Sequence, residues 1–192
     1  MGALDIAEPL VGRLVSVEPF AQRHRDGLRA AAADDPTIFR YMSFVPGEFD
    51  AWFDAALAHG PAEVPLVVVV GGEPVGSTRY LAYEPEHRRV EIGWTWLRRS
   101  AWGTGVNTET KLLLLEHAFE RAELHRVEFK TDIRNERTRA ALLGIGAQFE
   151  GTFRKHMILP GGVRRDSAWY AILDDEWPEV KALLVERAAR GR

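Results

Sequence analysis

The segment from Val90 to His117 constrains the fold of this chain most, because a strand pattern, a glycine turn and a helix pattern follow one another without a break. β-Branched and aromatic residues dominate positions 90–97, which favours a largely buried strand. The turn Trp102-Gly103-Thr104-Gly105 ends that pattern, and apolar residues return at helical spacing from Thr108. The residues that can share one helix face are Leu112, Leu115, Ala118 and Phe119, while Glu109, Lys111, Glu116 and Glu120 are expected largely elsewhere. The turn is therefore expected at the N-terminus of a helix.

A turn in this position is suited to an anion. The first amides of a helix have no intrahelical partners, and the helix dipole adds a partial positive charge. Gly103 and Gly105 let the backbone approach a ligand closely. A GxG sequence by itself is more typical of a tight turn than of a phosphate site, so the place of the turn between strand and helix carries the argument.

The rest of the chain alternates strand and helix patterns. The expected strands are Leu10–Val17, Leu66–Val70, Val75–Tyr83, Arg126–Asp132, Phe153–Leu159 and Asp166–Leu173. The expected helices are Gln22–Ala33, Glu48–His59, Asn135–Leu143 and Asp175–Ala188. Hairpins followed by a strand-helix-strand crossover predict an α+β fold with a mixed sheet and helices on both faces. A dinucleotide-binding fold is the weaker interpretation, because Thr108 stands where a third glycine would be needed and no further βαβ unit follows.

Composition narrows the class of protein. At 192 residues, with 46% hydrophobic and 28% charged residues, residues 1–192 are expected to form one soluble domain. A net charge of -3 gives no general attraction to nucleic acid or to acidic membranes. There is no cysteine, no metal-ligand spacing, no signal-peptide pattern and no apolar run of membrane-spanning length. We therefore expect a cytoplasmic protein without a metal site.

Two ordered motifs carry a family resemblance. The sequence WGTGVNTE at 102–109 resembles the acetyl-CoA pyrophosphate loop of the GNAT N-acetyltransferases, in the branch of the ribosomal-protein alanine acetyltransferases RimJ and RimL. The sequence NERTRAA at 135–141, followed by Gly146-Ala147, is similar to the second motif of that branch. The segment 151–170 resembles the C-terminal end of the family, so the likeness covers roughly the whole chain. Ser100 departs from the Gln or Arg of the general pattern, which puts one side-chain contact to phosphate in doubt.

The resemblance implies a fold and a set of cofactor contacts. In the family, two central parallel strands splay apart, and the pantetheine of acetyl-CoA fits between them as an extra strand. Thr95, Trp96 and Leu97 would offer it backbone amides, one of them to the thioester oxygen. The residues implied for the pyrophosphate are Trp102, Gly103, Thr104, Gly105, Val106 and Asn107. Those implied for the far pantetheine, the adenosine or the ribose phosphate are Asn135, Thr138, Arg139, Arg98 and Arg99. The structural alternatives are that the pair Arg98 and Arg99 is simply exposed to solvent and that Asn135 caps a helix.

The implied reaction is direct attack of a neutral primary amine on the thioester, which calls for a base. Glu91 is the candidate base, and its alternative is a partly buried carboxylate paired to an arginine. Tyr170 is the candidate acid for the departing thiolate, and its alternative is ordinary sheet packing. His156 has suitable chemistry for either a catalytic or a substrate-side role, although a single histidine on a strand is often structural.

The acceptor side is less defined by sequence. Tyr41 and Met42 lie in a segment that resembles the substrate-side loop of the RimJ/RimL branch, and Trp94 belongs to a tryptophan cluster that suits either a cavity or the core. The implied partner is a small-molecule amine or a peptide N-terminus, and a homodimer is compatible with the family. Two other functions stay open: a CoA-binding sensor without turnover, and an acyltransferase that uses a longer acyl-CoA.

Overall fold

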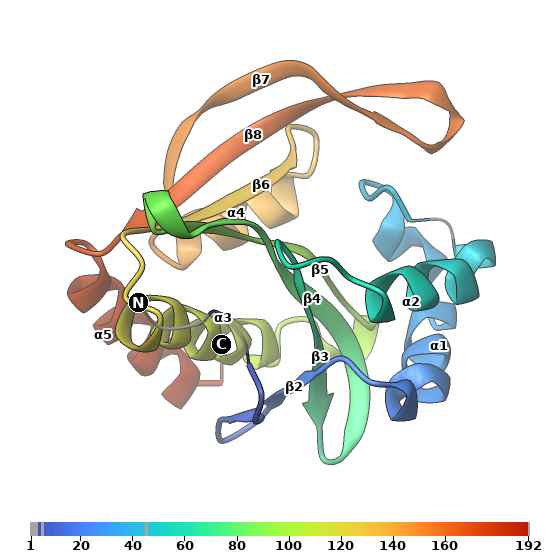
Figure 1. The fold of residues 1–192 in the computed structure, drawn as a ribbon, viewed down its shortest axis with the longest axis horizontal. Helices are drawn as coiled ribbons and strands as arrows, with labels where there is room; N and C mark the ends of the chain where they lie inside the picture. The colour runs from blue at the N-terminus through green and yellow to red at the C-terminus, as the bar shows by residue number, and fades with distance from the viewer. Residues whose placement is uncertain (1–3, 5, 45, 192) are drawn as a thin grey trace.

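A mixed sheet organises the computed structural model, which describes residues 4, 6–44 and 46–191. The sheet has eight strands in the order β1-β2-β3-β4-β5-β6-β8-β7, and only β5 and β6 run parallel among the described pairs. The strands are β1 (Leu10–Val11), β2 (Ser16–Pro19), β3 (Val64–Val70), β4 (Glu73–Glu84), β5 (Arg89–Leu97), β6 (Arg126–Asp132), β7 (Gln148–Leu159) and β8 (Val163–Leu173). The long β7–β8 hairpin, orange to red in Figure 1, extends past the other strands.

Helices cover both faces of this sheet (Figure 1). They are α1 (Arg25–Ala33), α2 (Phe49–Leu57), α3 (Val106–Glu116), α4 (Glu136–Gly144) and α5 (Trp177–Ala189). Alternation along β3 separates the two cores: Leu66 and Val68 pack in the core that contains α3 and α5, whereas Val67 and Val69 pack in the core that contains α1 and α2. The predicted α+β fold, with its mixed sheet and two helical layers, is confirmed.

The first strand differs from the prediction. The segment Leu10–Val17 is not one strand, because the chain turns after β1 and Gly12 N–H donates to the Val15 carbonyl at 2.8 Å. The carboxylate of Glu109 accepts the N–H groups of Arg13, Leu14 and Val15 at 2.9, 2.6 and 3.0 Å. Amides that are bonded to a carboxylate on α3 are not free to continue a β ladder, which explains the break.

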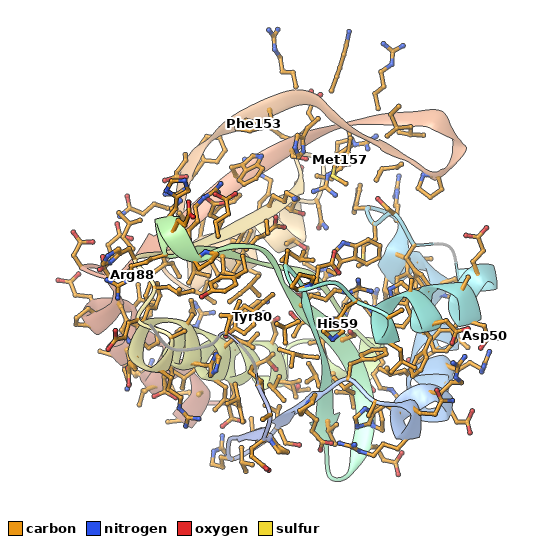
Figure 2. The ribbon with its side chains drawn as sticks, in the orientation of Figure 1. Asp50, His59, Tyr80, Arg88, Phe153 and Met157 are labelled. Carbon is orange, nitrogen blue, oxygen red and sulfur yellow. The ribbon has the colours of Figure 1, made fainter. Side chains whose placement is uncertain are left out.

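Two polar residues of α3 also differ from the prediction. Glu109 and Lys111 are 5% and 4% exposed, although a helical pattern of apolar residues placed them away from the buried face. The expected apolar residues Leu115, Ala118 and Phe119 are indeed buried. The core between β4 and α3 contains Tyr80, labelled in Figure 2, whose hydroxyl donates to the Leu114 carbonyl at 2.6 Å. Helix α3 is therefore enclosed on more sides than an amphipathic surface helix.

In the part of the chain that the structure describes, no helix has both the length and the apolar character that crossing a membrane requires.

Candidate active site

The two parallel strands part near their middle. β5 and β6 are paired at Arg89, Val90 and Glu91, and the described pairing ends there, although β5 runs on to Leu97 and β6 to Asp132. The backbone polar groups on the β6-facing edge of β5 then have no strand partner in the described ladder. A cavity of about 410 Å³ lies between the diverging strands and reaches the start of α3. The predicted splaying of the central parallel strands is confirmed.

A bulge in β5 shapes this edge. The pairing with β4 shifts register between Ser77 and Arg79, and Trp94 adopts a positive φ of 49°. A non-glycine residue in this conformation is strained, by about 1–2 kcal/mol. The following residue, Thr95, bonds its hydroxyl to that of Thr78 at 2.8 Å. Trp94 and Thr95, which form the bulge, both line the cavity, next to the place where the pantetheine contacts were expected.

Lys111 braces the bulge from the helix. Its Nζ donates to Thr95 Oγ1 at 2.9 Å and lies 5.9 Å from the centre of the Phe129 ring. Burial lowers the pKa of Lys111 to about 7. This lysine lines the cavity, and sequence analysis missed it because charged residues on a helix are normally solvated.

The glycine turn leads into the N-terminus of α3 as predicted. Gly103 has a φ of +72°, and no atom lies within 4 Å of the position that a Cβ would take. Gly105, with a φ of +84°, is the N-cap, and the first helical bond runs from Glu109 N–H to its carbonyl at 2.9 Å. The amides of residues 106–108 therefore precede the helical bonding pattern. An open glycine backbone beside these amides fits a diphosphate.

The side chains of the turn divide into two groups. Trp102 lines the cavity and donates its Nε1–H to the Leu97 carbonyl at 2.9 Å, and Asn107 also lines it. Thr104 donates its hydroxyl to the Ala101 carbonyl at 2.7 Å, and Val106 is buried in the core. Thr104 and Val106 can thus contribute backbone groups only.

Arg137 lines the cavity beside the glycine turn. Its guanidinium lies 3.5 Å from the centre of the Trp102 ring, and Arg99 lies 4.4 Å from the same ring. Arg139, which sequence analysis selected, instead donates to the Tyr170 hydroxyl at 3.2 Å and does not line the cavity. Arg98 is similarly engaged, 4.0 Å from Asp34. The rotation of α4 decides which arginine faces the cavity.

Asn135 and Thr138 line the cavity together. Asn135 is also the N-cap of α4, because its side-chain oxygen accepts the Thr138 N–H at 3.1 Å. The capping role that sequence analysis held open is present. The cap leaves the remaining polar atoms of the Asn135 amide available to a ligand.

Glu91 occupies the inner end of the cavity, where the strands part. It is 3% exposed, and its carboxylate accepts a hydrogen bond from Lys130 Nζ at 2.6 Å. Burial raises the pKa of Glu91, and Lys130 opposes that rise. The carboxylate is thus paired, to a lysine rather than to the arginine considered from sequence. A buried carboxylate with a raised pKa facing a cavity is suited to accepting a proton.

Two catalytic candidates lie outside the cavity lining. Tyr170 is 1% exposed, packs against Phe149 and has its hydroxyl bonded by Arg139. His156 is on the β7–β8 hairpin, where its Nδ1 lies 3.1 Å from Ser167 Oγ and its ring contacts Trp169. The structure therefore does not bring either side chain to Glu91 through this cavity.

The acceptor-side candidates Tyr41, Met42 and Trp94 do line the cavity. Met157 and Arg165 join them from the β7–β8 hairpin, on which Figure 2 labels Phe153 and Met157. Arg165 was not predicted as a site residue, because an arginine on a predicted hairpin is usually solvated and nothing in its spacing indicates burial. One end of the cavity is thus lined by the helix start and Arg137, and the other by Glu91 and the hairpin.

The parting parallel strands and the glycine turn that leads into α3 are the features that the family resemblance implied for the fold. The acetyltransferase (GNAT) domain family matches residues 15–148, and the chain belongs to this family. The resemblance to that family seen in the sequence is thereby confirmed.

Individual relatives agree with this assignment. The chain is 34% identical over 91 residues to a putative ribosomal N-acetyltransferase, YdaF, of Bacillus subtilis; the match covers 47% of this chain and about half, 49%, of that relative. A solved structure of a putative acetyltransferase from T. thermophilus is 38% identical, covers 95% of this chain and 98% of its own, and superposes with a TM-score of 0.87. Mycobacterium smegmatis RimJ in complex with CoA-disulfide is 24% identical, covers 96% and 98%, and shares the fold with a TM-score of 0.80.

Proposed function

We propose that this protein is an N-acetyltransferase that transfers the acetyl group of acetyl-CoA to a primary amine. The observation that carries the proposal is the cavity itself, which extends from the free amides at the start of α3 to the buried carboxylate of Glu91. One end is suited to an anion and the other to an amine. Membership in the GNAT family and the CoA-disulfide in the related RimJ structure support CoA as the carrier.

Acetyl-CoA would be held along the parted edge of β5. In this proposal the amides of residues 95–97 bond the pantetheine, the turn at 102–107 takes the diphosphate, and Asn135 and Thr138 contact the far end. Arg137 replaces Arg139 as the proposed contact to the ribose phosphate, because it is stacked on Trp102 at the open end. Thr104 and Val106 contribute through the backbone.

Glu91 is proposed as the general base. When bound, acetyl-CoA supplies an activated thioester; the C–N bond to the amine forms and the C–S bond breaks. Glu91 accepts the proton that the acceptor ammonium must lose before attack, directly or through one water. A backbone amide near Thr95 stabilises the oxyanion. The departing thiolate takes up one proton, for which we assign no side chain, because the Tyr170 hydroxyl lies outside the cavity lining.

The proposed acceptor is a peptide N-terminus or a small-molecule amine, bound among Tyr41, Met42 and Trp94. The names of the relatives support the peptide class, since YdaF is described as a putative ribosomal N-acetyltransferase. We also propose that the protein is cytoplasmic. A homodimer is part of the same proposal, and sedimentation would measure the oligomeric state.

The decisive experiment combines binding and turnover. Isothermal titration with acetyl-CoA and CoA is expected to give saturable binding, and an amine panel with thiol detection is expected to give amine-dependent CoA release. No binding at millimolar ligand would refute the cofactor assignment. Binding without thiol release by any amine would instead identify a sensor. Faster turnover of propionyl- or succinyl-CoA than of acetyl-CoA would show that the enzyme transfers a larger acyl group.

A further inference from the structure

Arg165 is a buried cation in the wall of the proposed acceptor end. It lies on β8 opposite Met157 of β7, and both side chains line the cavity. Only 7% of its surface is exposed. A guanidinium removed from water needs hydrogen-bond acceptors or a counter-charge to offset the lost hydration.

Few protein groups compensate Arg165. Its Nη1 donates to the Tyr41 carbonyl at 3.4 Å, which is a long hydrogen bond. Its Nε is buried and has no hydrogen-bond partner in the described residues. Among the described residues, no carboxylate oxygen lies within 4.0 Å of the Arg165 guanidinium, the distance that defines a salt bridge. Most of the donors of this side chain are therefore available.

The nearby acids are already bonded to other cations. Glu91 is paired to Lys130 at 2.6 Å, and Asp132 accepts the backbone N–H and the Nε–H of Arg134 at 2.9 and 2.8 Å. Burial lowers the pKa of Arg165, and Arg134 adds to that effect, while the more distant Asp132 and Glu91 oppose it only in part. The acceptor end thus has an incompletely compensated positive charge beside a carboxylate.

We propose that Arg165 binds a carboxylate of the acceptor, so that the substrate class is an amine that also carries a carboxylate. This inference rests on the proposed function, because the acceptor must enter the cavity that Arg165 lines. A guanidinium binds a carboxylate through two parallel hydrogen bonds, and Glu91 is in the same cavity for the ammonium end. The carboxylate comes either from a free amino acid or from an acidic side chain near a peptide N-terminus.

Matched amine pairs test the proposal. Free amino acids are compared with their amides, and peptides with Asp or Glu at position two or three with the corresponding Asn or Gln peptides. For one of the two sets, kcat/KM is expected to be about 10- to 100-fold higher for the carboxylate member, mainly through KM. Which set shows the preference identifies the source of the carboxylate.

Variants separate recognition from stability. Arg165→Met is expected to abolish the preference by lowering kcat/KM of the carboxylate members to that of their neutral partners, and Arg165→Lys to restore part of it. Arg164→Met, at the exposed neighbouring position, is the matched control and should keep the preference. An equal loss for charged and neutral members would assign Arg165 to holding the Tyr41 loop and overturn the proposal.

Binding measured without turnover separates the role of Arg165 from the proposed function. Titration of the same pairs into the CoA-saturated protein measures the carboxylate preference directly. A preference without turnover would count against the proposed function alone. Equal affinity for the two members of each pair, or equal kcat/KM, would count against the role of Arg165 alone.

Discussion

Lys111 Nζ donates a hydrogen bond to Thr95 Oγ1 at 2.9 Å, which ties the middle of α3 to the bulged edge of β5. The lysine is 4% exposed and has no carboxylate partner within salt-bridge distance among the described residues. The charge is therefore disfavoured, and burial lowers the pKa from 10.5 to about 7. This contact joins a titratable side chain of α3 to the edge of the cavity.

The low pKa predicts a pH-dependent stability. Between about pH 7 and 10.5 the unfolded chain binds the Lys111 proton and the folded chain does not, so the free energy of unfolding should rise with pH in this window. Below pH 7 the full penalty, of the order of a few kcal/mol, is present. Lys111→Met removes the group, so its stability gain over the natural chain should be largest near pH 6 and shrink by pH 9. Urea unfolding at pH 6, 7, 8 and 9 measures this difference, and a pH-independent difference would contradict it.

Gly103→Val should weaken CoA binding without unfolding the protein. A Cβ at this position has no protein atom within 4 Å, but Gly103 lines the cavity next to the start of α3 and has a φ of +72°. Strain alone should cost about 1–2 kcal/mol of stability. Isothermal titration is expected to show a loss of CoA affinity of at least tenfold.

Gly71→Val is the matched control for this substitution. Gly71 also has a positive φ, +59°, and open space around its Cβ position, but it lies in the β3–β4 turn. It should show a similar stability loss with unchanged CoA affinity. Equal affinity in the two variants would refute the assignment of the 102–107 turn to the diphosphate.

Glu91→Gln should lower kcat by about 10²- to 10⁴-fold with little change in the KM for acetyl-CoA. The base must be ionised to accept a proton, so kcat of the natural enzyme should rise with pH through the pKa of Glu91, which burial raises above 4.5. The variant should lose this rise of kcat with pH, which is the acidic limb of the pH profile. Glu128→Gln is the control, since Glu128 is buried opposite Glu91 on β6 but pairs with Arg89 and Arg126 outside the cavity lining. A retained acidic limb in Glu91→Gln would assign the base elsewhere.

Arg137→Ala should weaken binding of CoA about 10-fold but leave dephospho-CoA almost unaffected, because the proposed contact is to the ribose phosphate. Titration with both ligands measures the difference. Arg98→Ala serves as the comparison, because Arg98 faces Asp34. If Arg137→Ala weakens both ligands equally, Arg137 acts through its stacking on Trp102.

Glu109→Ala should destabilise the protein by about 2–4 kcal/mol, because three partly or fully buried amides of residues 13–15 lose one common acceptor. Glu116→Ala, on the same helix, removes only a half-exposed pair with Lys181 and should cost less than about 1 kcal/mol. Denaturant midpoints compare the two. Similar losses would mean that the Glu109 bonds contribute little.

The sequence predicted most helices and strands well, because hydrophobic periodicity and turn residues are properties of short segments. The strand Arg126–Asp132 has the predicted bounds, and the glycine turn lies at the start of α3. The splaying of β5 and β6 came from the family resemblance, since no periodicity reports where two strands part.

The missed and misplaced site residues depend on tertiary packing. Lys111 and Arg165 are charged residues that other elements bury, and hydrophobic periodicity assigns such residues to solvent. Arg137 and Arg139 differ by two positions on one helix, so about 200° of rotation separates them. Only the docking of α4 decides which of the two reaches the cavity.

The positive φ of Trp94 has a consequence for engineering. A designer seeking heat resistance would relax this residue into regular extended geometry and recover the energy held there. A regular β5 would then pair with β6 beyond Glu91. The gain in thermal stability would come from closing the cavity between the two strands.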